Sequence, residues 1–275
     1  MALSMNTNPT SLNAQRNLGN AQTKLSQNLA RLSSGLRINQ AADDAAGLGI
    51  SEKMRAQVRG LAQASRNAND GVSMIQVAEG AMNEQAGILT RLRELAVQSA
   101  NGTLGTTERG FIKTEADEGI KELDRISAVT DFNGVKMLGA DSGTQTMQVG
   151  TSSSANDRID ITFAQTDSAT LFGGATIDLS TAAASRTALD DIDTAISTLS
   201  TSRASVGASQ NRLVVTMNNL SVAKENIAAS ESRIRDVDVA EETAAMTRNQ
   251  ILSQAGVSVL AQANQLPSAA LKLLG

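Results

Sequence analysis

The chain has 275 residues, a formal net charge of −4 and no cysteine, histidine, tryptophan or tyrosine. Without cysteine and histidine it can form no disulfide, thiol nucleophile, imidazole base or Cys/His zinc site, so we expect neither an enzyme nor a bound cofactor or metal. The mild charge predicts no nucleic-acid partner, and the lack of about 18 consecutive apolar residues predicts no membrane span. The only two prolines, Pro9 and Pro267, leave a proline-free stretch between them, which favours long uninterrupted helices.

Leucines at intervals of seven predict the first helix. One row consists of Leu18, Leu25 and Leu32, and a neighbouring row consists of Leu29 and Leu36. Gly35 is a suitable residue to end or bend this helix, because glycine readily adopts the left-handed conformation found at helix C-termini.

A second and a third helix follow. Asp43 and Asp44 suit the positively polarised start of a helix, and apolar residues at intervals of three or four continue from there to Leu95. Asn101 and Gly102 are expected to end this second helix. The third helix is predicted over residues 107–128, with its isoleucines and leucine on one side.

Residues 131–185 have a different composition, richer in Gly, Ser, Thr and Asp. Apolar residues alternate with polar ones over 146–149 and 158–163, which predicts two short strands and a hairpin. A further short strand is predicted over 176–180. We therefore expect the chain to run out along helices, turn in this small β region and return.

The last third carries an uninterrupted heptad pattern. One apolar row repeats every seven residues: Ile192, Leu199, Val206, Leu213, Leu220, Ile227 and Ile234. The neighbouring row is apolar early and becomes polar later, which favours a long helix packed on partner helices over a two-stranded zipper. The predicted fold class is mainly α: a long helical hairpin or coiled-coil bundle with a small β-hairpin region.

Several runs in this sequence resemble bacterial flagellins. Near the N-terminus these are LARLSSGLRIN at 29–39 and AADDAAGL at 41–48, followed by RELAVQSANG at 93–102. Near the C-terminus they include QILSQAG at 250–256 and LAQANQ at 260–265. Each run is weak evidence alone, but many occur in the right order over both ends of the chain, so the resemblance is specific.

The resemblance implies a fold and a function. Residues 1–43 with 235–275 would form the terminal coiled coil called D0, and 44–234 the helical rod called D1, with its β region near 139–180 at the tip and no outer domains. The subunit would polymerise into the extracellular flagellar filament for motility. Coiled-coil and polymerisation contacts would use Leu18, Leu25, Leu29, Leu32, Leu36, Ile234, Leu252, Val259, Leu260 and Leu266, and the D1 stripe would be the heptad row from Ile192 to Ile227.

The resemblance also implies partners. The first nine residues lack the features of a secretory signal, and flagellins leave the cell through the flagellum's own export channel. A flagellar export chaperone, the filament cap and hook-junction proteins would be partners, and both chain ends, about 1–43 and 235–275, would become ordered on assembly. A Toll-like innate immune receptor would contact Arg91, Leu95 and Glu115.

Two other interpretations of the sequence are open. A hook–filament junction protein shares flagellin-like ends, although the density of matches at 93–102 and 250–265 favours flagellin proper. An enzyme or ligand-binding module in residues 139–185 is disfavoured, because that segment is too short for a core of its own and lacks a convergent set of polar residues.

Overall fold

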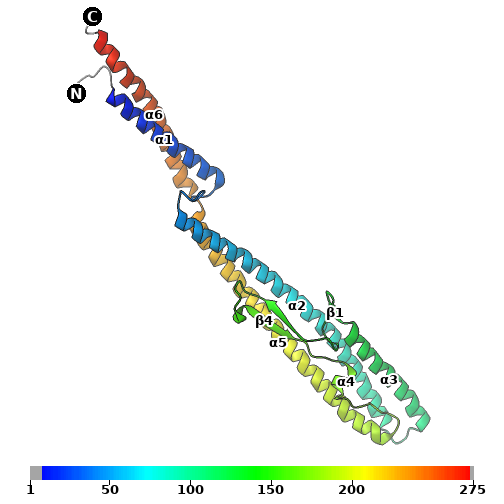
Figure 1. The fold of residues 1–275 in the computed structure, drawn as a ribbon. Coiled ribbons are helices and arrows are strands. Elements are labelled where there is room, and N and C mark those ends of the chain that lie inside the picture. The colour runs from blue at the N-terminus through cyan, green and yellow to red at the C-terminus, as the bar shows by residue number, and fades with distance from the viewer. Residues whose placement is uncertain (1–7, 273–275) are drawn as a thin grey trace. The chain divides into compact units, whose positions relative to one another are not determined.

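The computed structural model of the chain describes residues 8–272, and the side chains of 8–265 (Figure 1). Leu266, one of the predicted polymerisation residues, therefore lies outside the described side chains. The chain divides into two compact units, and each is described separately below. The terminal unit contains the residues up to Val58 together with those from Asn226 onward, and the central unit is Arg59–Glu225. Both boundaries lie within long helices, α2 (Ala45–Ser99) and α5 (Ala182–Arg235).

The terminal unit is built on an antiparallel pair of helices, α1 (Pro9–Ser34) and α6 (Val239–Lys272), which lie side by side (Figure 1). Asn8 caps α1 by accepting a hydrogen bond from the Ser11 amide, and Pro9 occupies the first turn, where its missing N–H costs nothing. Gly35 ends the helix with a φ of 71°. The predicted first helix and its end are thus confirmed.

Beyond Gly35 the chain forms a short bridge with the end of α5. Leu36 pairs with Asp236, the Arg37 amide donates to the Arg235 carbonyl at 2.6 Å, and the Val237 amide donates to the Gly35 carbonyl at 3.1 Å. These bonds satisfy backbone groups that the helix ends leave free. The bridge therefore holds the two segments that flank the paired helices at a fixed register.

Replacing Gly35 with alanine is expected to lower the free energy of unfolding of the terminal unit by about 1–2 kcal/mol, because a Cβ is strained at this positive φ. Gly19→Ala is the matched control: Gly19 lies inside α1, and apart from its chain neighbours and the adjoining helix backbone no atom lies within 4 Å of the position that a Cβ would take there. Alanine at 19 should therefore stabilise the helix by about 0.5–1 kcal/mol. Urea unfolding followed by circular dichroism measures the unfolding free energies of both variants. Equal stability of the two variants would contradict this account.

The central unit packs α2 and α5 antiparallel, with α3 (Thr106–Val129) lying along α2 (Figure 1). Five residues of the heptad row are buried in its core: Ile192, Leu199, Val206, Leu213 and Leu220. Ile227 and Ile234, which belong to the terminal unit, are half-buried. The third predicted helix is confirmed to within a residue at each end.

Two small antiparallel hairpins lie between α3 and α5. The first, β1 (Asp131–Phe132) with β2 (Val135–Lys136), turns at Asn133 and Gly134, which both have positive φ. This Asn-Gly pair is a strong hairpin signal. The second hairpin pairs β3 (Thr144–Gln148) with β4 (Arg158–Thr162), so the two main predicted strands are confirmed. Two short helices complete the region, the 3-10 helix η1 (Ala155–Asp157) and α4 (Ser168–Leu171).

The prediction of a short strand over residues 176–180 is wrong. Ile177 and Leu179 are buried, but this segment pairs with no strand among the described residues. Instead the Leu179 carbonyl accepts a hydrogen bond from Ser99 Oγ at 2.7 Å, and Asp178 accepts one from the Ser180 amide. An extended segment packed onto helices buries every second residue just as a strand does, which explains the alternating pattern.

The place of the larger hairpin also differs from the expectation. Asn67, far from the end of α2, donates to the Gln148 carbonyl at 3.0 Å, and Met147 lies against Gly71. The β3–β4 hairpin thus lies beside the middle of the central unit's helices and not at its tip. The reason is that residues 100–105 reverse the chain, so that α3 runs back along α2 and carries the β region with it (Figure 1).

Candidate assembly surface

The seam between α1 and α6 consists mostly of small residues and half-buried leucines. On α1 the buried positions are Ala14, Ala21 and Asn28, with Leu18, Leu25 and Leu32 half-buried between them. On α6 the inward positions recur at intervals of three or four: Asn249, Ser253, Gly256, Leu260 and Ala263. Leu18 packs closely against Gly256, where an added Cβ would lie 3.3 Å from Leu18 Cδ1. The small side chains let the two helices approach closely.

Polar contacts set the register of this pair. At the start of α1, Asn8 Nδ2 donates to the Ala263 carbonyl at 2.8 Å, and Ser11 Oγ donates to Asn264 Oδ1 at the same distance. Further along, Asn249 Nδ2 donates to Oδ1 of the buried Asn28 at 3.1 Å. A partly buried asparagine pair between two helices disfavours other registers, because sliding would break its hydrogen bond and leave the buried Asn28 amide unpaired.

Charged side chains near the C-terminal end of α1 are also paired. Arg31 lies 3.9 Å from both Asp43 and Glu242. The backbone amides of Gln40 and Asn39 donate to Asp43 and, together with the Arg31 charge, lower the pKa of its carboxyl. The basic N-terminal segment and the acidic start of α6 therefore meet through partly buried side chains.

This seam buries little apolar volume. Among the described residues of α1 and α6, the apolar side chains that are fully buried are all alanines. By contrast, the central unit encloses large side chains completely, among them Met82, Leu89 and Leu123. Helix pairs draw most of their stability from packing of an apolar face. The terminal pair is therefore held more weakly than the central unit.

A second apolar stripe on α6 has no partner within the described chain. It consists of Ile251, Leu252, Ala255 and Val259, all exposed, and we call it the outer stripe. Leu252 and Val259 are 52% and 57% exposed, so these two predicted coiled-coil residues lie outside the seam with α1. Leu29 of α1 is exposed as well, whereas Leu36 and Ile234 are half-buried. Exposed apolar groups arranged in a stripe are typical of a surface that another helix covers.

The predicted receptor residues lie in the central unit. Arg91 Nη2 is 2.8 Å from Glu115 Oε1 on α3, and Arg91 Nη1 is 2.9 Å from Glu94 Oε2. These hydrogen bonds, that to Glu115 above all, raise the pKa of the Arg91 guanidinium. Leu95, in contrast, is only 2% exposed and belongs to the core, so it offers no surface contact. The structure thus brings Arg91 and Glu115 together on the surface and places Leu95 beneath it.

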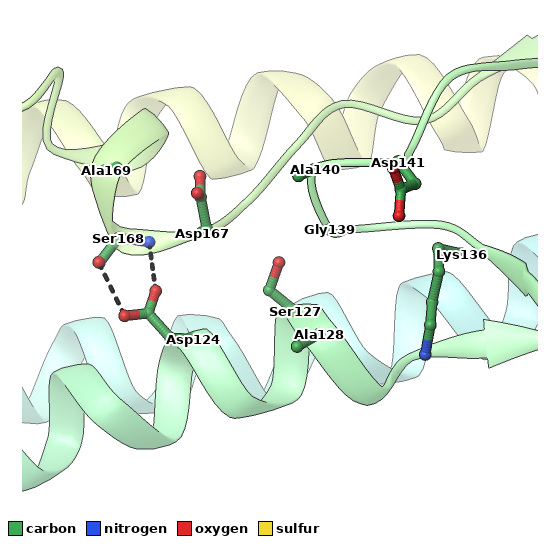
Figure 2. A pocket seen from close by; sticks show the side chains of 10 residues that line it. All are labelled: Asp124, Ser127, Ala128, Lys136, Gly139, Ala140, Asp141, Asp167, Ser168 and Ala169. Atoms are coloured by element: carbon green, nitrogen blue, oxygen red, sulfur yellow. Dashed lines mark hydrogen bonds between the residues drawn. The ribbon is translucent and has the colours of Figure 1, made fainter.

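A hollow of about 430 Å³ lies between α3 and the loop that precedes α4 (Figure 2). Three carboxylates line it, but two of them already serve as structural acceptors. Asp124 accepts from the Ser168 amide and hydroxyl at 2.7 and 3.0 Å, and Asp167 caps α4 through the Thr170 amide. Ser127 Oγ donates to the Leu138 carbonyl. Asp124 and Ser127 of α3 thus hold the neighbouring segments, and Figure 2 shows the two Asp124–Ser168 bonds.

The described part of the chain offers little for other kinds of site. Within residues 8–272 no cluster of three or more Asp or Glu residues is arranged to hold a metal ion. Nor does any helix in that range combine the length and apolar character needed to cross a bilayer.

These features define a class of mainly α-helical proteins whose first and last helices pair, and two solved flagellar proteins have a similar fold. A crystal structure of Bacillus cereus flagellin matches with a TM-score of 0.51 and 29% identity, covering 56% of this chain and 88% of that one. A putative flagellar hook-associated protein from Vibrio parahaemolyticus matches with a TM-score of 0.60 over 70% of this chain and 100% of that one, but at 15% identity.

Sequence comparison identifies the family. Residues 5–146 match the bacterial flagellin N-terminal helical region, and residues 189–274 match the C-terminal helical region. A flagellin of Halalkalibacterium halodurans is 47% identical over 98% of this chain and 99% of its own length. The flagellar filament 33 kDa core protein of Treponema phagedenis is 42% identical with the same coverage of both. The chain belongs to the bacterial flagellin family.

Proposed function

We propose that this flagellin is the structural subunit of a bacterial flagellar filament. The observation that carries the proposal is the outer stripe of α6, an apolar surface without a partner within the described chain, in a protein that shares nearly half its sequence with a flagellin along its whole length. The Treponema relative is named as a filament core protein. Repeated contacts between unlike surfaces of identical subunits generate an open filament when the rotation does not close.

The two units would take different parts in this assembly. We assign the paired terminal helices to an inner coiled coil, the predicted D0 of residues 1–43 with 235–275, and the remainder to the D1 rod of residues 44–234. The two compact units divide at 58/59 and 225/226, which is nearer the middle of the chain than these proposed bounds. Polar flagellin A of Vibrio parahaemolyticus aligns over 376 positions against the 275 residues here, which supports a chain without outer domains.

Seeded polymerisation tests this function. Purified subunit added to short filament fragments should extend them into long filaments visible by electron microscopy. A hook–filament junction protein should not elongate such seeds. The flagellin relatives, with more than 40% identity, already favour the filament subunit over the junction protein, since the hook-associated structure shares only the fold. Failure of the purified chain to elongate homologous seeds would refute the proposal.

The proposal includes an extracellular location and the partners of flagellar export. The subunit would leave through the flagellum's channel, where a chain without cysteine cannot form obstructing disulfides. An export chaperone and the filament cap would bind the C-terminal helix, because its outer stripe is an apolar surface available before assembly. Hook-junction proteins would contact the first subunits.

Amide hydrogen exchange should distinguish the two units of the dilute subunit. We expect the amides of α1 and α6 to exchange faster than those of residues 190–220, because the α1–α6 seam buries only small residues fully. In the filament the same amides should become protected as neighbours cover the outer stripe. Equal protection of both units in the dilute subunit would contradict the weak pairing of the ends.

Recognition by a Toll-like innate immune receptor is a second proposal, favoured by the exposed Arg91–Glu115 pair. Arg91→Ala should reduce the response of receptor-bearing cells to depolymerised subunit by roughly tenfold, the loss typical of a charged contact residue. Arg125→Ala is the matched control, because Arg125 makes a similar exposed ion pair with Glu122 on α3. An unchanged response to the Arg91 variant would exclude this contact.

A further inference from the structure

One aromatic side chain of the central unit projects into solvent. Of the four phenylalanines, Phe163 and Phe172 are buried and Phe132 is half-buried, whereas Phe111 on α3 is 72% exposed. A well-packed aromatic side chain is a frequent anchor of a protein interface, because it buries a large area at a small entropic cost. Phe111 is therefore a candidate anchor for a partner.

The surface around Phe111 is acidic. Residues at intervals of three and four along the same side of α3 are Glu108, Phe111, Glu115 and Glu118. Glu115 and Glu118 are paired with Arg91 and Lys121, but Glu108 has no ion pair with any residue of the described range. A partner for Phe111 should thus offer an apolar hollow with positive charge at its rim.

The same unit contains such a hollow between β4 and α5. Its volume is about 560 Å³, and its apolar lining consists of the buried Val149 and Ile159 and of Val215, which is 60% exposed. Arg158 and Arg212 line it too, and Arg212 forms no ion pair within residues 8–272. We call this hollow the β4–α5 groove.

The one carboxylate that lines the groove, that of Asp157, already accepts hydrogen bonds from its own loop. Asp157 accepts hydrogen bonds from the amide and hydroxyl of Ser152, which lower the pKa of its carboxyl. Asp157 Oδ2 is thus engaged in the loop and the carboxylate stays ionised, so Arg158 and Arg212 together leave the groove with one excess positive charge. The groove complements the Phe111 surface in both apolar character and charge.

Phe111 cannot reach the groove of its own chain. The Arg91–Glu115 and Arg93–Asp193 ion pairs place Glu115 and Asp193 at about the same level along α2. Arg212 is nineteen residues from Asp193 on α5, which is roughly 28 Å of helix. Phe111 lies a further turn away, towards the end of α2. The two surfaces can meet only between two subunits shifted along the helix axis.

We propose that Phe111 of one subunit inserts into the β4–α5 groove of a second copy of this chain, with Glu108 beside the groove's arginines. This inference rests on the proposed filament function and names one of its contacts. The contact joins unlike surfaces, so it leaves a free Phe111 at one end of a row of subunits and a free groove at the other. Such a contact propagates along a filament and does not close on itself.

The chain has no cysteine, so a disulfide can be placed at this contact without interference. The double variant Phe111→Cys/Val215→Cys is assembled on seeds under reducing conditions, oxidised and separated on a non-reducing gel. We expect a ladder of covalent multimers, because a disulfide forms only when the two Cα atoms lie within about 7 Å. The control Phe111→Cys/Thr201→Cys moves the second cysteine to an exposed position about four turns away along α5 and should give no ladder.

The outcomes separate the contact from the filament function. Filaments without a ladder, or with equal ladders for both double variants, would overturn the contact and leave the filament function intact. Failure of the unmodified chain to elongate seeds would instead overturn the filament function.

A second measurement applies if the cysteine variant does not assemble. Phe111→Ala should raise the subunit concentration left in equilibrium with filaments by about tenfold or more, with an unchanged circular dichroism spectrum. Phe132→Ala does not remove the proposed contact and serves as the aromatic control. A Phe111→Ala concentration within about twofold of the unmodified chain would overturn the proposal.

Discussion

Leu252→Asp is expected to abolish filament growth on seeds while the subunit keeps its helices. Leu252 lies in the outer stripe of α6, is 52% exposed and lies outside the seam with α1, so the free subunit has room for a carboxylate there. In a filament the stripe would be covered by neighbouring subunits. Burying an unpaired carboxylate in such an interface costs several kcal/mol, which assembly cannot offset when every subunit carries the change.

The control places the same charge on another side of the same helix. Gln254 is exposed, two residues further along α6, and lies outside the outer stripe. Gln254→Asp should elongate seeds much as the unmodified chain does, and both variants should give the same helical circular dichroism spectrum. If Leu252→Asp elongated seeds at the normal rate, the outer stripe would not be an assembly surface.

Leu213→Ala is expected to destabilise the central unit by about 2–5 kcal/mol, the usual cost of a cavity left by a buried leucine. Leu213 is fully buried at the close approach of α5 to α2, where a Cβ on Gly71 would come within 3.2 Å of Leu213 Cδ1. The neighbouring Met147 of β3 also packs at this point. The substitution therefore opens a cavity where two helices and the larger hairpin meet.

Val222→Ala is the matched control for this substitution. Val222 lies on the same helix and in the same unit but is 58% exposed, so its loss should change the unfolding free energy by no more than about 0.5 kcal/mol. Urea unfolding monitored by hydrogen exchange of the central amides measures the effect without contributions from the terminal unit. Similar free energies for the two variants would show that Leu213 does not hold the core together.

The helices could be predicted because the apolar residues that indicate them recur at regular, short intervals in the sequence. Intervals of seven on Ile192–Leu220 and of three or four before Leu95 reveal buried faces whatever the partner is. The partner itself is not visible in the spacing. Leu252 and Val259 are seven residues apart like the leucines of α1, yet they belong to the outer stripe and not to the seam, where Ser253, Gly256 and Leu260 lie.

Sequence patterns mislead where the path of the chain decides the structure. Asn101 and Gly102 mark where a helix ends but not that the chain then reverses, so the sequence alone puts the β3–β4 hairpin at the tip. Alternating burial at Ile177 and Leu179 does not tell a strand from an extended segment on helices. The Arg91–Glu115 pair is visible only through resemblance, since residues from two helices carry no joint local pattern.

The alanine-lined seam of α1 and α6 has a thermodynamic consequence. Because the subunit buries little of its terminal aliphatic surface by itself, most of that surface is removed from water only when neighbours arrive. Such burial is driven mainly by entropy near room temperature and carries a large negative heat-capacity change. Growth of the filament should therefore absorb or release little heat at one intermediate temperature and become weaker in the cold. The attraction that holds the ends together in the filament would thus come largely from the release of water.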